Sequence, residues 1–264
     1  MQVQCDDREG SVWRVQLRSK DDDDAALDGA ALSQLEALLD ESNGPRVLVL
    51  EGQDGRFCRG MSLGSLDQGA TDDAVDGVRR YARCLSRLRC GRPALIAIVD
   101  GPALGGGLGL AAAADVLIAT ERARFGLPEA MVGLVPAMVL PLCRERMAPQ
   151  KVRRLALGQP ALDAVVAERW GLVDVLAKDA AAAEKALFVQ LKQLLRLSPD
   201  AVAQLRDLSA RSAGWALEAA VTAGADVTAA SVTDEAVLSG VRAFVCGEPP
   251  PWFERPKRRK GGSR

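Results

Sequence analysis

The chain has 264 residues, of which 48% are hydrophobic and 26% are charged, and its formal net charge is −1. Such a composition supports a sizeable buried core and provides no global field that would attract nucleic acid. The chain contains no histidine, which excludes histidine-dependent triads, dyads and zinc motifs. Any proton transfer must therefore use a carboxylate, Lys, Tyr, Cys or water.

Cysteine spacing and apolar stretches predict the compartment. Six cysteines are scattered without a C-x-x-C pair, which favours a reduced intracellular protein over a disulfide scaffold. The N-terminus has no basic-then-apolar signal, and the longest apolar stretch, 102–114, is short and rich in glycine. Such a stretch does not span a bilayer. We therefore expect a cytoplasmic protein that binds neither a membrane nor nucleic acid.

The first half of the chain alternates strand-like and helix-like segments. Alternating or continuous apolar residues predict strands, and apolar residues at helical spacing predict helices. In chain order we expect a strand at 12–17, a helix at 30–39, a strand at 47–50, a polar mobile loop at 64–77, a helix at 73–90, a strand at 94–101, a helix opened by the glycines at 105–109, and a strand at 115–120. Strands separated by helices predict an α/β fold with parallel strands.

The second half is expected to be mainly helical. Leu187, Leu191, Leu194 and Leu195 form one apolar stripe, the motif "LSPD" ends it, and 201–244 reads as further helix. The tail beyond 247 is rich in proline and then basic, which is typical of a disordered segment. We therefore divide the chain into a core at 1–195, a helical region at 196–246 and a basic tail at 247–264.

Two loops are unusually rich in glycine. Residues 55–62 nearly match the phosphate loop G-x-x-x-x-G-K-[ST], but Met61 replaces the lysine that contacts the outer phosphates. Residues 105–109 depart from the dinucleotide motif G-x-G-x-x-G, because Leu110 replaces its third glycine. A nucleotide-binding switch protein remains an alternative that rests only on the imperfect phosphate loop.

Another chemistry suits two loops that each expose backbone N–H groups. One N–H from each loop can bind a single carbonyl oxygen and stabilise the charge that forms when a thioester becomes an enolate. Loss of one donor from such an oxyanion hole typically costs roughly 10²–10³ in rate. Glycines would let the acyl group lie against the backbone. The alternative is that these glycines serve only close packing between a helix and a strand.

Four motifs, "RFCRGMSL", "GPALGGGLGL", "ARFGLPEAMVGLVP" and "ERWGLVD", occur in an order and spacing that resemble the enoyl-CoA hydratase/isomerase, or crotonase, superfamily. The resemblance covers about residues 12–200. It implies a spiral of ββα units, a C-terminal helical region that builds trimers or hexamers, and no metal or redox cofactor. It places the oxyanion-hole donors on the N–H groups of Met61 and Gly106, with Gly105 and Gly109 lining the acyl group.

The resemblance also implies which acids would act. Typical hydratases of the family carry two catalytic glutamates; the first position is Gly109 in this chain, and the second is Glu129. One carboxylate can still serve an elimination by accepting the C2 proton and then protonating the departing 3-hydroxyl. Apolar neighbours, namely Phe125, Leu127, Pro128 and Met131, are expected to raise the pKa of Glu129. The alternative is a glutamate that only begins a helix.

Residues 133–175 narrow the resemblance to the dehydratases of polyketide β-branching cassettes. That resemblance implies a lyase that converts a 3-hydroxy-3-methylglutaryl group on acyl carrier protein into the 3-methylglutaconyl thioester. The alternatives are an acyl-CoA enoyl isomerase, hydratase or decarboxylase of the superfamily, and a non-catalytic partner subunit.

Such a substrate carries a distal carboxylate and a carrier. The candidate cations are Arg59, Arg80 and Arg92, and Tyr81 is a candidate contact of the acyl chain, although helix surfaces and helix packing would explain these residues as well. An acidic carrier protein, or CoA in its place, would meet basic side chains. The candidates are Arg144, Arg146, Lys151, Arg153, Arg154 and the tail at 257–260.

Overall fold

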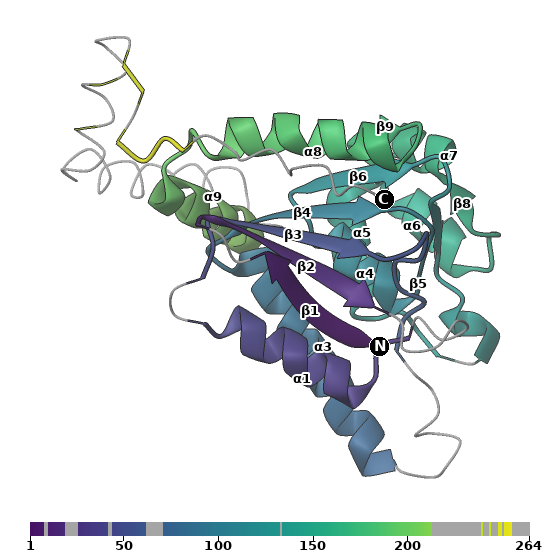
Figure 1. Cartoon of the computed structure of the whole chain (residues 1–264). Helices are drawn as coiled ribbons and strands as arrows, with labels where there is room; N and C mark the ends of the chain where they lie inside the picture. Colours follow the sequence, from purple (N-terminus) through teal and green to yellow (C-terminus); the bar gives the residue numbers. More distant parts are fainter. Residues whose placement is uncertain are drawn as a thin grey trace.

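A six-stranded sheet in the order β1-β2-β3-β4-β6-β9 forms the centre of the molecule (Figure 1). β1 (Gln2–Asp7) pairs antiparallel with β2 (Val12–Arg18), whereas all other neighbours are parallel. The remaining strands are β3 (Val47–Gly52), β4 (Ala94–Val99), β6 (Val116–Thr120) and β9 (Val175–Ala177). This arrangement confirms the expected α/β class with parallel strands.

The computed structural model describes residues 1–7, 10–18, 26–41, 44–61, 71–132 and 134–212. Near the C-terminus it describes Ser239, Ala243, 248–249 and 251–254. No helix within these ranges combines the length and the apolar character needed to cross a membrane.

Both faces of the central sheet are buried. Successive side chains of a strand point to opposite faces, and in β3 the side chains of both sets are covered. Leu48 and Leu50 of β3 pack in the main core, whereas Val47 and Val49 belong to a second cluster. The main core includes residues of α1 (Gly29–Leu39), α3 (Thr71–Cys90) and α4 (Gly106–Ala112). The second cluster includes three of the four leucines of the expected stripe, on and just after α8 (Ala180–Leu194). Figure 1 shows α8 on one side of the sheet and α1 and α3 on the other.

A second, three-stranded sheet lies at the ends of the central strands. β5 (Pro102–Leu104) pairs in parallel with β7 (Arg124–Gly126), which pairs antiparallel with β8 (Leu162–Asp163). Between and after these strands come a 3-10 helix, η1 (Glu129–Val132), and the helices α5 (Val139–Arg146), α6 (Pro149–Ala156) and α7 (Ala164–Arg169). The sequence predicted none of the three short strands as separate elements.

One expected loop is partly helical. The segment 64–77 was predicted to be a polar mobile loop and 73–90 a helix; because α3 begins at Thr71, the helix prediction is confirmed and the loop prediction is wrong for 71–77. Gly77 lies on this helix, and a Cβ placed there would be 3.6 Å from Cε of Met61. The first turns of α3 thus lie near the side chain of Met61, although their sequence is polar and contains glycine. Residues 62–70 lie outside the described residues.

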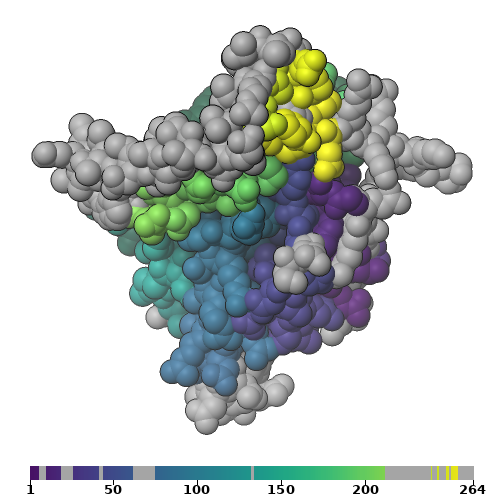
Figure 2. Space-filling view, turned by 90° about the vertical axis from the view of Figure 1, so that its left-hand side faces the viewer, coloured from purple at the N-terminus to yellow at the C-terminus, as the bar shows by residue number. Residues whose placement is uncertain are grey.

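Hydrogen bonds connect the C-terminal part of the described chain to the rest of the fold. In α9 (Pro199–Ser212), the guanidinium of Arg206 is 4% exposed, and it donates to Asp115 and to the carbonyls of Leu88, Gly91 and Pro93. Figure 2 shows α9, in green, lying against α3, in blue. Further along, Trp252 Nε1 donates to the carbonyl of Arg196 at 2.8 Å. Thus 251–254, within the predicted tail, is hydrogen-bonded to the core, whereas 255–264 lies outside the described residues.

Candidate active site

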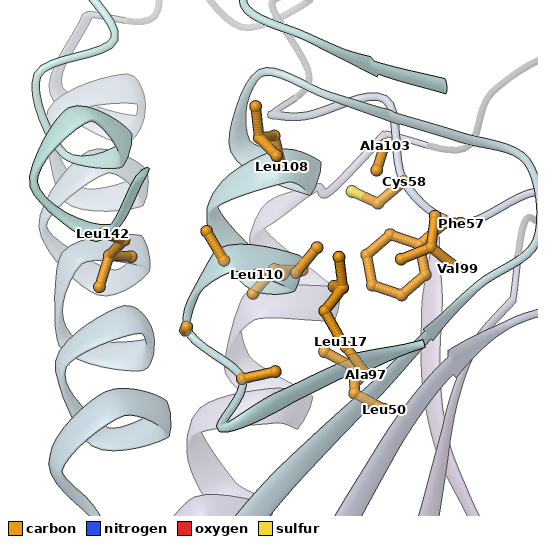
Figure 3. Close-up of a cluster of buried hydrophobic side chains, with 14 of the residues drawn as sticks. Leu50, Phe57, Cys58, Ala97, Val99, Ala103, Leu108, Leu110, Leu117 and Leu142 are labelled. Atoms are coloured by element: carbon orange, nitrogen blue, oxygen red, sulfur yellow. The ribbon is translucent and has the colours of Figure 1, made fainter. Parts of the chain in front are cut away.

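The two glycine-rich loops predicted to form the site run side by side. Cys58 N–H donates to the carbonyl of Pro102 at 3.1 Å, and Leu104 N–H donates to the carbonyl of Cys58 at 2.9 Å. These bonds form a parallel bridge between Cys58 and Ala103. Figure 3 shows the side chains of Cys58 and Phe57 near Ala103, within a cluster of buried hydrophobic side chains. Backbone pairing thus brings a loop that follows β3 against a loop that follows β4.

The approach of the loops requires glycine at its tightest point. A Cβ placed on Gly107 would lie 2.0 Å from the carbonyl oxygen of Cys58, and one placed on Gly60 would lie 3.1 Å from the backbone nitrogen of Gly106. Gly60 also has a φ of +103°, a conformation that side chains disfavour. Close packing therefore explains Gly107, and the same packing brings Gly60 against Gly106.

The N–H groups of Met61 and Gly106 point away from the hydrogen bonds that hold their own peptides. In a trans peptide, the N–H is directed opposite to the C=O. The carbonyl of Gly60 accepts from Leu27 N–H at 2.7 Å, and the carbonyl of Gly105 accepts from Gly109 N–H at 3.2 Å. Within the described part of the chain, no acceptor is bonded to the N–H of Met61 or Gly106. Each loop therefore presents one N–H group without an acceptor among the described residues.

Glu129 lies against the second of these loops. β7 leads into η1, and its last residue, Gly126, accepts from Gly105 N–H at 2.9 Å. A Cβ placed on Gly105 would be 3.1 Å from Oε1 of Glu129, while Oε2 is buried and has no hydrogen-bond partner among the described residues. Burial raises the pKa of Glu129 above its ordinary value, although a bond from its own backbone N–H opposes the rise.

The environment of Glu129 differs in part from the expected one. Phe125 and Leu127 are buried as predicted. Met131 is 82% exposed and Pro128 is also exposed, so these two do not enclose the carboxyl. In the short 3-10 helix, Ala130 and Met131 are exposed, which a sequence window could not reveal. The expected direction of the pKa shift is nevertheless present.

Tyr81 and Gly109 meet inside the protein. The side chain of Tyr81 is 1% exposed, and its hydroxyl donates to the carbonyl of Gly106. A Cβ placed on Gly109 would lie only 2.3 Å from that hydroxyl oxygen. The space beside residue 109, where the family resemblance would place a first glutamate, is thus occupied by a phenol. No sequence pattern joined these two residues, because they lie on different helices.

The structure separates the three candidate arginines. Arg59 is exposed and makes no ion pair with any residue in the described ranges; its carbonyl oxygen is 4.0 Å from a Cβ placed on Gly105. Arg80 contacts Glu36 of α1 at 3.7 Å. Arg92 pairs with Asp200 at 2.5 Å and precedes β4, whereas the glycine loop follows that strand. Only Arg59 is therefore both beside the loops and available to a ligand.

The basic residues considered for carrier binding have different roles. Arg146 binds the carbonyls of Ala114 and Leu172 and pairs with Asp174, so it serves the fold. The ammonium of Lys151 and the guanidinium of Arg154 lie over the ring of Trp170, at 5.4 Å and 5.9 Å from its centroid. Arg144, Arg153 and Arg154 are exposed. The basic tail at 257–260 lies outside the described residues.

Comparison with known proteins identifies the family. Residues 7–255 match the enoyl-CoA hydratase/isomerase family, and the chain belongs to it. Carnitinyl-CoA dehydratase from Proteus mirabilis is 32% identical over 168 residues, and this match spans 62% of either chain. A putative enoyl-CoA hydratase from Thermus thermophilus is 29% identical over 225 residues, which cover 83% of this chain and 88% of that protein.

Solved structures give the same answer for the fold. Pseudomonas aeruginosa AtuE superimposes with a TM-score of 0.88 at 32% identity, covering 96% of this chain and 100% of that one. An enoyl-CoA hydratase/isomerase from Marinobacter aquaeolei gives a TM-score of 0.87 at 26% identity, covering 96% and 99%. The expected crotonase-like fold is therefore confirmed.

The contact between Gly107 and Cys58 makes a testable prediction about stability. Gly107→Ala places a methyl group onto a backbone oxygen that the parallel bridge holds in place. We expect its free energy of unfolding to fall by about 2 kcal/mol or more, as is common for overpacking. Gly29→Ala is the matched control: it also lies in the first turn of a helix, but a Cβ there meets nothing within 4 Å. The control should be unchanged or more stable by up to about 1 kcal/mol. Urea unfolding measures both, and equal stabilities would contradict the close approach.

Proposed function

We propose that this protein is a dehydratase that removes water from a 3-hydroxyacyl thioester. The observation that carries this proposal is the pairing of one half-buried carboxylate, Glu129, with two available N–H groups on adjoining loops. The place of a second carboxylate, at Gly109, is filled by Tyr81. A site with one acid–base group suits an elimination in which the same group accepts a proton and then donates it.

The proposed mechanism has two proton transfers. Ionised Glu129 accepts the C2 proton, and the thioester becomes an enolate whose oxygen is bound by the N–H groups of Met61 and Gly106. The protonated carboxyl then gives its proton to the 3-hydroxyl as the C3–O bond breaks. Water and an enoyl thioester leave, and Glu129 is again ionised. General acid–base help of this kind contributes roughly 10²–10⁴ in rate, and the oxyanion donors contribute roughly 10²–10³ each.

We further propose that the acyl group is 3-hydroxy-3-methylglutaryl carried on an acyl carrier protein. The resemblance of residues 133–175 to β-branching dehydratases supports this choice of substrate. Of the three candidate arginines, Arg59 is the one that lies beside the loops with no ion pair to a described residue, and we assign it to the distal carboxylate. The name of the Proteus mirabilis relative, carnitinyl-CoA dehydratase, supports a dehydration but names a CoA thioester. CoA is therefore the alternative carrier.

A homotrimer, or a hexamer of two trimers, is the proposed assembly. Support comes from apolar side chains that follow Glu129 and face solvent in the single chain: Met131 is 82% exposed, Val135 72% and Leu134 44%. Exposed apolar side chains that lie close together in the sequence are often found at an interface between subunits.

Substitution of the carboxyl tests the proposed chemistry. In Glu129→Gln, the amide cannot accept the C2 proton, so turnover should fall by roughly 10²–10⁴ while the fold persists. The assay is intact-mass spectrometry of carrier protein loaded with 3-hydroxy-3-methylglutarate, in which the wild type should remove one water. Glu121→Gln, at an exposed position after β6, makes the same chemical change away from the site and should remain active.

Three other results would contradict this assignment. Loss of water together with carbon dioxide would indicate a decarboxylase, and migration of a double bond in an enoyl substrate would indicate an isomerase. No mass change on carrier protein or CoA would favour a non-catalytic subunit.

The raised pKa of Glu129 predicts the acid limb of the pH profile. The proposed base must be ionised, so kcat/KM should fall as the pH drops through the pKa of this carboxyl. Because burial raises that pKa, the limb should lie above the 4.5 of an ordinary glutamate. Rates measured between about pH 4 and about pH 8 locate it, with the unfolding transition followed in parallel. A limb at or below the ordinary value would contradict the assignment of Glu129 as the base.

Arg59 makes a prediction about substrate selection. Arg59→Gln should raise KM for the 3-hydroxy-3-methylglutaryl thioester by roughly 10-fold, because a charge-assisted bond contributes about 1.5–3 kcal/mol. The 3-hydroxy-3-methylbutyryl thioester lacks the distal carboxylate and should be affected little. Arg92→Gln is the control, since Arg92 pairs with Asp200. Equal effects of Arg59→Gln on the two substrates would exclude the assigned contact.

A further inference from the structure

Tyr81 holds one of the two peptides that flank the α-carbon of Gly106. Its hydroxyl donates to the carbonyl of Gly106, which belongs to the peptide that follows that carbon. The preceding peptide contains the Gly106 N–H, and its carbonyl is held by Gly109 N–H at 3.2 Å. Both peptide planes around this α-carbon are thus anchored. The direction of the Gly106 N–H depends on the two anchors together.

Tyr81 also fills the space beside Gly109. Besides the 2.3 Å approach to the Tyr81 hydroxyl, a Cβ at residue 109 would lie 3.0 Å from Cγ2 of Val139 and 3.6 Å from Cδ1 of Leu85. A Cβ placed on Gly106 would lie 3.2 Å from both Cζ and the hydroxyl oxygen of Tyr81. The phenol therefore leaves no room for a side chain at 109 and packs closely against the oxyanion loop.

We propose that Tyr81 is a positioning residue that aims the Gly106 N–H and, by occupying the place of a residue-109 side chain, limits the site to one acid–base group. The inference rests on the proposed function, in which that N–H binds the thioester oxygen. Tyr81 itself touches no reacting atom, because its side chain is enclosed.

The state of the hydroxyl suits this role. Burial raises the pKa of Tyr81 well above 10, and the nearby Cys58, Cys143 and Glu129 raise it further. The group therefore stays a neutral donor over the range in which the protein is folded. Glu129 is near but next to a different residue of the loop: its Oε1 is 3.1 Å from a Cβ placed on Gly105, whereas the Tyr81 hydroxyl is 3.2 Å from one placed on Gly106.

The first experiment measures recognition of the thioester oxygen. Carrier protein bearing S-acetyl phosphopantetheine has the carbonyl, whereas the S-ethyl thioether lacks it; acetyl-CoA and S-ethyl-CoA form the equivalent CoA pair. The ratio of the two affinities reports the oxyanion donors and is insensitive to general packing. Tyr81→Phe keeps the ring and removes the hydroxyl, so this ratio should fall by roughly 10-fold, and kcat should fall by roughly 10-fold to 100-fold with KM nearly constant.

The matched control removes another buried hydroxyl. Thr120 is fully buried and donates to Asp100 at the end of β6. Thr120→Val should alter stability without altering the preference for the carbonyl ligand. If Tyr81→Phe keeps the wild-type preference and kcat, the positioning role is overturned.

The second experiment tests whether Tyr81 fills the space beside residue 109, and it measures stability rather than enzyme activity. Gly109→Ala should lower Tm by roughly 5 °C in the wild-type background, because the methyl group meets the Tyr81 hydroxyl. In the Tyr81→Phe background at least half of that loss should disappear, a coupling that a double-mutant cycle isolates. If the Tm losses of the two substitutions are additive, Tyr81 does not exclude a side chain at residue 109.

The outcomes separate this inference from the proposed function. A wild type that dehydrates the substrate while Tyr81→Phe is unchanged overturns the inference alone. A wild type without turnover, but with a carbonyl preference that depends on Tyr81, contradicts the dehydratase and supports the positioning role. A wild type that binds neither ligand of either pair overturns both.

Discussion

The site depends on a backbone bridge between two loops that are distant in the chain. Cys58 and the segment from Pro102 to Leu104 exchange two hydrogen bonds, and Gly107 leaves room for the carbonyl of Cys58 to approach its α-carbon. These bonds hold Gly60 against Gly106. Because the carbonyls of Gly60 and Gly105 are bonded to other N–H groups, the N–H groups of Met61 and Gly106 point in the opposite direction. Backbone donors held in this way need little reorganisation when charge develops on a ligand, which is the condition for strong electrostatic stabilisation.

Two side chains beside that bridge, Glu129 and Tyr81, determine which charged and neutral groups the site contains. One carboxylate oxygen of Glu129 is buried and has no hydrogen-bond partner among the described residues, and this burial disfavours the charged form and raises the pKa of the group. A second carboxylate nearby would raise the pKa of Glu129 further, since like charges disfavour each other in a buried site. The hydroxyl of Tyr81 takes the corresponding space as a neutral group with a satisfied hydrogen bond. One acid, two amides and an enclosed phenol thus form a consistent set.

Much of the fold followed from periodicity. β2, β3, β4 and β6 were predicted because their apolar residues alternate or run without interruption, as buried parallel strands require. β1 is a polar edge strand, and β5, β7, β8 and β9 have two or three residues each. Segments of this kind form because a neighbouring strand supplies hydrogen-bond partners, which no local pattern records.

The sequence by itself determined the absence of histidine chemistry, the α/β class and the two glycine loops, and it named Glu129 as the candidate acid, because these are properties of residue type and spacing. Only the tertiary structure decided which donors lack an acceptor among the described residues, that Arg59 lies beside the loops with no ion pair to any of those residues whereas Arg80 and Arg92 are paired, and that Tyr81 fills the space next to Gly109. Those facts arise from contacts between α1, α3, α4 and the loops, and a contact between distant segments exists only after packing has chosen their relative positions.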